Sequence, residues 1–132
     1  MIHGLDTSVV VRIISGLPEE AAKHVGERIA SEIASGELFS VSPLVLSEAY
    51  FALQHHYDFT KEEALQSLRS LAHTEGILVS ESVRAILDQP NLAKLNPGFV
   101  DRMIVGEYAN GGSDTYSCEK SFRRLQGSVV LG

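Results

Sequence analysis

The chain has 132 residues, of which 44% are hydrophobic, so it is long enough to bury a substantial core and matches the size of one domain. Eleven Lys and Arg residues against 17 Asp and Glu residues give a formal net charge of -6, which excludes a strongly basic protein that coats nucleic acid non-specifically. The single cysteine, Cys118, excludes an internal disulfide, and His3, Asp6 and Arg12 interrupt the first apolar run, which excludes a signal peptide or a membrane span there. We therefore expect a soluble cytoplasmic protein with no membrane contact.

Short apolar runs alternate with longer segments of helical periodicity, a pattern typical of a parallel sheet with helices on its faces. In chain order, strands are predicted at residues 2–6, 38–41, 77–79, 115–118 and 129–131. Helices are predicted at residues 7–15, 19–35, 43–56, from 60 onwards, at 80–95 with an interruption at Pro90, and at 99–109. The sequence thus predicts an α/β fold with three α/β/α layers, a central and mostly parallel sheet, and a single domain over residues 1–132.

Local signals fix several of these helix ends. The tripeptide Gly16-Leu17-Pro18 separates the first two helices, and Gly36 ends the second. Thr60 followed by Glu63 has the form of a capping box, with the helix beginning directly after Thr60. These signals predict boundaries, whereas the apolar positions predict which faces are buried.

Two acidic residues stand in apolar surroundings. Asp6 lies between a predicted strand and the apolar helix that follows, where a charge near the core is costly unless it is paired. Glu48 lies in "SPLVLSEAYFAL", the most apolar helix of the chain, which we expect to be well buried. Burial there would raise the pKa of Glu48 or require a cation beside it.

Four acids are predicted to gather at one rim of the sheet. Asp6 and Glu119 each follow a strand, and the carboxyl ends of parallel strands share one edge. Asp101 and Glu48 lie in the first and second turns of helices that begin near the same rim. Each acid also has a structural explanation: Asp6 could cap a helix, and Asp101 could complement a helix dipole.

A cluster of carboxylates persists only with a counterion, and Mg²⁺ fits because it takes oxygen ligands and keeps several waters. Mn²⁺ is an alternative. Zinc fits poorly, since there is one cysteine and His55 and His56 face different sides of a helix. Carboxylate-held magnesium activates water and shields the charge that develops on a phosphate. The four acids therefore predict metal-dependent hydrolysis of a phosphodiester.

At these positions the chain resembles the PIN-domain family, and within it the small ribonuclease toxins of bacterial toxin–antitoxin pairs, the VapC type. "LDTSVVVRII" is similar to the opening strand and helix of the family, "SPLVLSEAYFAL" to the helix of its second acid, and "FVDRMIVGEYANGG" to the segment of its third. The family usually has an aspartate where this chain has Glu119, and an asparagine is commoner where Ser8 stands. Asp114 is the other candidate for the fourth acid, at the amino end of its strand.

The resemblance implies an endoribonuclease whose catalytic and metal-binding residues are Asp6, Glu48, Asp101 and Glu119. It also implies a homodimer and a cognate antitoxin whose extended tail blocks the site. Five basic residues are expected to hold RNA phosphates on either side of the cut. They are Arg12, Arg102, Lys120, Arg123 and Arg124.

Two other functions stay open. The replacement of aspartate by the longer Glu119 favours a PIN fold with a weakened metal site that grips RNA or a protein without cutting it. A receiver-like domain that accepts a phosphoryl group on Asp6 would need a second acid beside it, and Gly4-Leu5 offers none.

Overall fold

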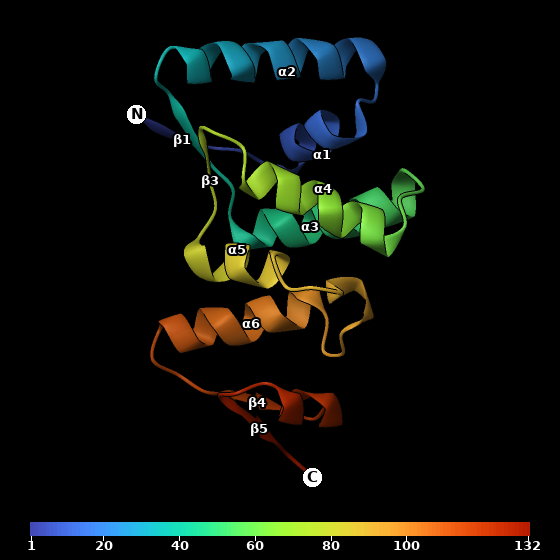
Figure 1. Cartoon of the computed structure of the whole chain (residues 1–132), viewed down its shortest axis with the longest axis vertical. Helices are drawn as coiled ribbons and strands as arrows, with labels where there is room; N and C mark the ends of the chain where they lie inside the picture. The colour runs from blue at the N-terminus through green and yellow to red at the C-terminus, as the bar shows by residue number, and fades with distance from the viewer. The chain divides into compact units, whose positions relative to one another are not determined.

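The computed structural model describes all 132 residues, which form two compact units, Met1–Ser80 and Glu81–Gly132 (Figure 1). Six α-helices and five short strands confirm the predicted mixture of α and β structure. The strands pair within two separate parallel sheets, so the prediction of one central sheet is wrong. The three-layer arrangement and the single domain over residues 1–132 stay predictions.

In the first unit, three strands form a parallel sheet in the order β1 (Ile2–Gly4), β2 (Leu38–Ser40) and β3 (Ile77–Leu78). Four helices accompany it: α1 (Thr7–Ser15), α2 (Glu19–Ala34), α3 (Pro43–His56) and α4 (Lys61–Ala72). Helix α1 packs against both α2 and α3, and α3 also packs against α4 (Figure 1). The apolar stripes that the sequence predicted on these helices meet in this core. Its most deeply buried side chains are Val10, Leu46, Leu53 and Leu68.

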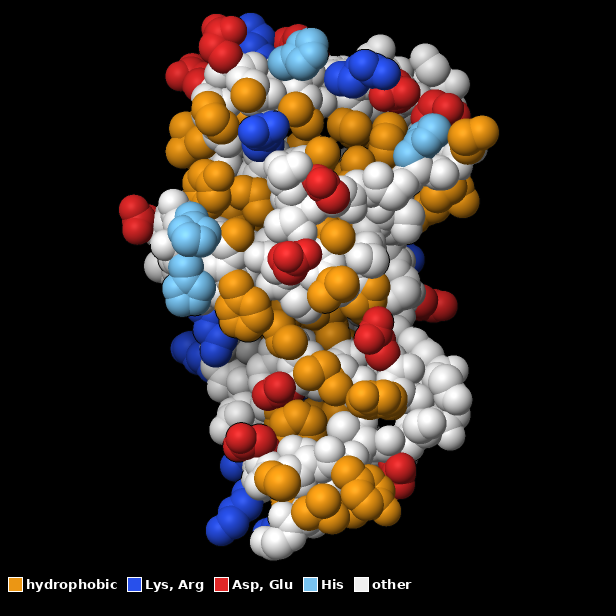
Figure 2. Space-filling model, turned by 180° about the vertical axis from the view of Figure 1, so that it is seen from behind, with side chains coloured by type: hydrophobic (Ala, Val, Ile, Leu, Met, Phe, Trp, Pro, Cys, Tyr) orange, Lys and Arg blue, Asp and Glu red, His pale blue; other side chains and the backbone are white.

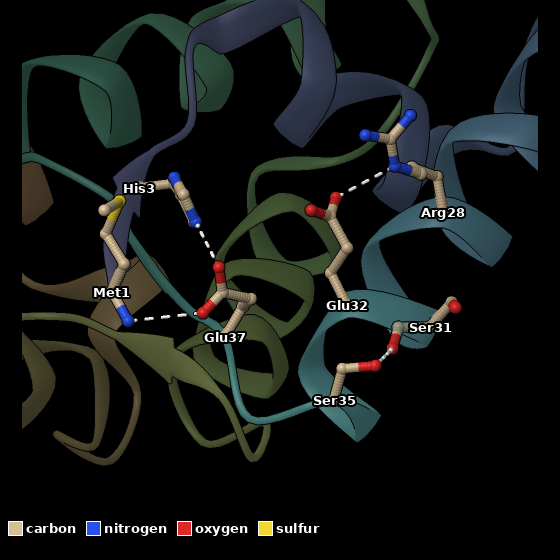
Figure 3. Close-up of polar contacts among 7 residues, drawn as sticks. All are labelled: Met1, His3, Arg28, Ser31, Glu32, Ser35 and Glu37. Atoms are coloured by element: carbon tan, nitrogen blue, oxygen red, sulfur yellow. Dashed lines mark hydrogen bonds and ion pairs between the residues drawn. The ribbon is translucent and has the colours of Figure 1, made fainter.

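A charged contact fastens the start of β1 to the turn between α2 and β2. Figure 3 shows the Glu37 carboxylate between the Met1 α-amino group, at 3.2 Å, and Nε2 of His3, at 3.1 Å. The His3 ring also lies 5.4 Å from the ring of Phe39 on the neighbouring strand. The hydrogen bond with His3, followed by that from Met1, lowers the pKa of Glu37. No local sequence signal predicts this contact, because His3 and Glu37 are 34 positions apart.

The second unit contains α5 (Glu81–Leu87), the 3₁₀ turn η1 (Leu92–Lys94), α6 (Phe99–Asn110), β4 (Thr115–Ser117), the 3₁₀ helix η2 (Lys120–Arg124) and β5 (Ser128–Val130). Strands β4 and β5 pair in parallel, with Thr115 opposite Ser128. Helix α6 packs on α5 and on β4, while η2 packs on β5 with Phe122 buried (Figure 1).

Most predicted helix boundaries are confirmed within one residue. Residues 7–15 and 43–56 are helical over the predicted range. The helix predicted at 80–95 instead ends at Leu87 and is followed by η1, because Pro90 has no N–H to continue the helical ladder. The 3₁₀ helix η2 was not predicted, since five residues are too few to show a helical period.

The predicted capping box at the start of α4 is present. The Thr60 hydroxyl accepts a hydrogen bond from the Glu63 backbone N–H at 3.0 Å, and the Glu63 carboxylate accepts one from the Thr60 N–H at 2.8 Å. Replacing Thr60 with Ala removes the first bond, and we expect the free energy of unfolding to fall by about 1 kcal/mol. Urea denaturation measures this change. An unchanged midpoint would show that water replaces the cap without cost.

Two buried hydroxyls lie on paired positions of the second sheet without hydrogen-bond partners, Oγ1 of Thr115 and Oγ of Ser128. Burying a hydroxyl without a partner is costly, and valine has the shape of threonine without that group. We expect Thr115→Val to raise the free energy of unfolding by about 1 kcal/mol. Urea denaturation beside Ser128→Ala tests this, and a loss of stability would show that an ordered water satisfies Thr115.

Candidate active site

Asp6 lies at the junction of β1 and α1 and is exposed, so the expected burial of this charge is wrong. Its neighbour Leu5 takes the buried position instead. The Asp6 Oδ1 atom accepts hydrogen bonds from the Val9 backbone N–H at 3.3 Å and from the Ser8 hydroxyl at 2.6 Å. Asp6 is therefore the N-cap of α1, which confirms the structural explanation of this residue.

These contacts also set the charge of Asp6. The hydrogen bond from Ser8 lowers the pKa of the carboxyl below its ordinary value of 3.8, and the Val9 N–H and the Arg12 charge act in the same direction. Hydrogen bonds to an ionised carboxylate favour the charged form. Asp6 is consequently an anion throughout the neutral range, as a metal ligand must be.

Glu48 lies in the second turn of α3 and is exposed, so the prediction of a well-buried, apolar environment is wrong. The reason is that α3 has an exposed apolar face. Leu44 is 72% exposed and Phe51 is 47% exposed, and these residues lie four before and three after Glu48 on the same side of the helix. The opposite side carries the buried residues Leu46, Ala49, Tyr50 and Leu53.

A hydrogen bond joins the two acids of the first unit through a neighbouring threonine. The Thr7 hydroxyl, on the first residue of α1, donates to Glu48 Oε1 at 3.0 Å. Asp6 directly precedes Thr7, so the carboxylates of Asp6 and Glu48 flank the same helix start. Within the chain, Asp6 accepts the Ser8 hydroxyl and Val9 N–H bonds at Oδ1, and Glu48 accepts the Thr7 bond at Oε1.

These two carboxylates suit a hard divalent cation. Mg²⁺ is held in proteins through one or two carboxylates, with waters and substrate phosphates completing its shell. Asp6 and Glu48 suit that requirement, because both are carboxylates and both are exposed to solvent. Within either unit, no three or more His, Cys, Asp and Glu side chains form a group that could hold a metal ion.

The other two predicted acids lie in the second unit. Asp101 is in the first turn of α6, where its charge complements the helix dipole, as its structural explanation required. Glu119 follows β4 and precedes η2, is exposed, and makes no side-chain capping bond. Asp114 lies at the amino end of β4, as predicted. Because β1 and β4 belong to different sheets, the single sheet edge expected beneath Asp6 and Glu119 is not formed.

Of the five predicted RNA-binding side chains, two are hydrogen-bonded within the chain and three are not. Arg102 donates to the Pro97 carbonyl at 2.8 Å and to Gln89 at 3.2 Å, so its guanidinium is held within the second unit. Arg124 donates to the Asn96 carbonyl at 2.9 Å. The remaining three are exposed and have no ion pair: Arg12, Lys120 and Arg123.

Sequence reasoning missed the hydroxyls that orient the acids. Thr7 and Ser8 each bond a carboxylate of the first unit. The available signal was the run Asp6-Thr7-Ser8 at a helix start, where short hydroxyl side chains commonly bond nearby polar groups. This run indicates the local contact of Ser8 with Asp6. It does not indicate the contact of Thr7 with Glu48, because these residues are 41 positions apart.

Comparison with known proteins gives no relative. Searches against protein-family models, curated proteins and solved structures each found no match to the chain. None of the helices combines the length and apolar character needed to cross a bilayer.

The Ser8 contact predicts how Asp6 titrates. Replacing Ser8 with Ala removes the largest cause of the lowered value, so we expect the pKa of Asp6 to rise toward 3.8. Because its folded pKa is lowered, ionised Asp6 adds to the free energy of unfolding at pH values above its unfolded pKa. This contribution is lost as the pH falls through the folded pKa. With the higher folded pKa of the Ser8→Ala variant, the loss is complete at a higher pH. NMR titration of the Asp6 carboxyl measures the shift, with Ser31→Ala on α2 as control. An equal pKa in both variants would contradict the assignment.

Proposed function

We propose that the chain is a magnesium-dependent endoribonuclease of the toxin type. The observation that carries this is the hydrogen bond from Thr7 to Glu48, which brings the second acid to the helix start where Asp6 lies. The sequence resemblance to PIN-domain toxins supports it over nearly the whole chain. Asp101 and Glu119 complete the proposed set of acids.

In this mechanism the bound metal supplies an activated water and charge shielding at the scissile phosphate. Asp6 and Glu48 would hold the ion through their carboxylates. Ser8 and the Val9 N–H fix the orientation of the Asp6 carboxylate and keep it ionised, while Thr7 fixes Glu48. Positioning of this kind matters because ligands that are held in place lose less freedom when the metal binds.

The substrate is RNA, and its phosphates are held by the exposed cations Arg12, Lys120 and Arg123. Arg102 and Arg124 have a partly structural role, since each donates a hydrogen bond to a main-chain carbonyl. The proposed partners are a second copy of the chain and an antitoxin, in the cytoplasm. The exposed side chains of Leu44 and Phe51 on α3 support a protein contact beside Glu48, because apolar groups at a surface favour association.

A cleavage assay tests the function. Purified protein is incubated with a single-stranded RNA and an RNA hairpin in Mg²⁺, in Mn²⁺ and in chelator. We expect cutting that requires the metal and falls by about a hundredfold or more in Asp6→Asn and Asp101→Asn, because each variant removes a carboxylate that holds the ion. We expect the cutting rate of Thr7→Val to fall by about tenfold to a hundredfold, since Thr7 orients Glu48 and does not hold the ion itself.

The matched control is Glu107→Gln, which removes an exposed acid from the same helix as Asp101 and leaves cutting unchanged. Cutting that survives chelation or both Asn variants would overturn the proposal. Saturable metal or RNA binding without cutting would instead support a binding module, the function that Glu119 in place of the usual aspartate favours.

A further inference from the structure

The negative charge of the chain lies in the first unit. Residues 1–80 contain eleven acids and five Lys or Arg residues, which account for the whole net charge of -6, whereas residues 81–132 contain six of each. Within the second unit, Lys120, Arg123 and Arg124 stand close together on η2, and Glu119 is the sole acid from residue 115 onwards. The end of the chain is therefore a local positive region on an acidic protein.

The sheet of the second unit carries two exposed side chains on paired positions. Thr115 is buried, whereas Tyr116, the next residue, is 65% exposed. Its register partner Val129 is 38% exposed, so the two side chains form an uncovered patch on β4 and β5. Parallel sheets are ordinarily covered on both faces, so an exposed aromatic and aliphatic pair on such a sheet is a candidate binding surface.

The aromatic patch and the positive region are neighbours. Helix η2 packs on β5, the partner strand of β4. Lys120 follows Tyr116 closely along the chain, and a separation of four positions allows at most about 14 Å between Cα atoms. Figure 2 shows hydrophobic side chains at the lower end of the view, with Lys or Arg side chains at its lower left edge and Asp or Glu side chains nearby, where β4 and β5 lie in Figure 1.

We propose that Tyr116 is a stacking platform for a base of single-stranded RNA, with Lys120 and Arg123 holding the adjoining phosphates. This rests on the proposed function and names the strandedness of its substrate. An exposed aromatic ring beside open cations is the combination that binds single strands, because every base presents a π-face and every nucleotide a phosphate. In a duplex the faces of the bases are already stacked, so a surface ring cannot reach them.

The contact of Arg124 with the Asn96 carbonyl holds η2 in place and so presents Lys120 and Arg123 beside the patch. The positive charge also favours RNA over an apolar protein partner, which would leave these cations desolvated or unused. Tyr108 on α6 is exposed to a similar degree, but no Lys or Arg lies within five positions of it, whereas Lys120 lies four positions after Tyr116. It therefore provides a matched comparison.

A fluorescence titration tests the proposal, since the chain contains no tryptophan. Tyr116→Trp places one reporter on the patch, and Tyr108→Trp places one on α6. Each protein is titrated in chelator with a single-stranded RNA oligonucleotide and with the same sequence as a duplex. We expect the single strand to quench the indole fluorescence of the Tyr116→Trp protein saturably and to leave that of the Tyr108→Trp protein unchanged.

Binding of labelled single strand to proteins without the reporter gives a second readout. We expect Tyr116→Ala to bind about fivefold to a hundredfold more weakly and Tyr116→Phe to bind within about twofold of the parent, because the ring stacks and the hydroxyl does not contribute. Lys120→Ala and Arg123→Ala should each weaken binding and flatten its salt dependence. Circular dichroism confirms that the variants are folded.

Equal quenching of both reporters, or unchanged affinity in Tyr116→Ala, would overturn the proposal. So would a duplex that binds as well as the single strand, or a reporter signal that follows protein concentration alone, which would make the patch a contact between copies. These results can be told apart from a failure of the nuclease proposal in the cleavage assay. Metal-dependent cutting with an inert Tyr116 leaves the nuclease intact, and quenching without cutting leaves an RNA-binding module.

Discussion

The packing of α1 against α3 is the constraint on which the candidate site depends. Val10 is fully buried and Val11 nearly so, and these adjacent positions fix the rotation of α1 about its axis. That rotation directs Thr7 toward α3, where it donates to Glu48. The site in the first unit is thus a consequence of core packing, because a helix turned differently would separate the two acids.

The start of α1 combines a structural and a proposed chemical role in one side chain. Asp6 caps the helix through Oδ1, and its side chain is exposed to solvent. The cap keeps the carboxylate ionised and oriented at the positive end of a helix dipole. The positive end of that dipole favours a negative group and repels a cation, so a metal ion at this helix start would need more than one carboxylate. In the proposed site Glu48, which Thr7 bonds, is the second carboxylate.

The unequal division of charge between the two units bears on where RNA could bind. The first unit is acidic and holds Asp6 and Glu48, while the second is balanced overall and concentrates its cations on η2. An acidic surface repels RNA except where a metal ion or a cation neutralises the phosphate. A nuclease of this composition would take its substrate through local basic groups, which limits non-specific binding along the strand.

The helices and their ends could be predicted from the amino-acid sequence. Periodic apolar positions, the capping box at Thr60 and the break at Pro90 are local features, because they depend on residues within one or two turns. The sequence also located Asp6 and Asp101 at helix starts. Three features could not be predicted in this way: the strands pair in two sheets, Glu48 is exposed to solvent, and Thr7 donates a hydrogen bond to Glu48. Those outcomes depend on which faces meet across long stretches of chain, and an apolar helix such as α3 does not reveal which of its sides stays uncovered.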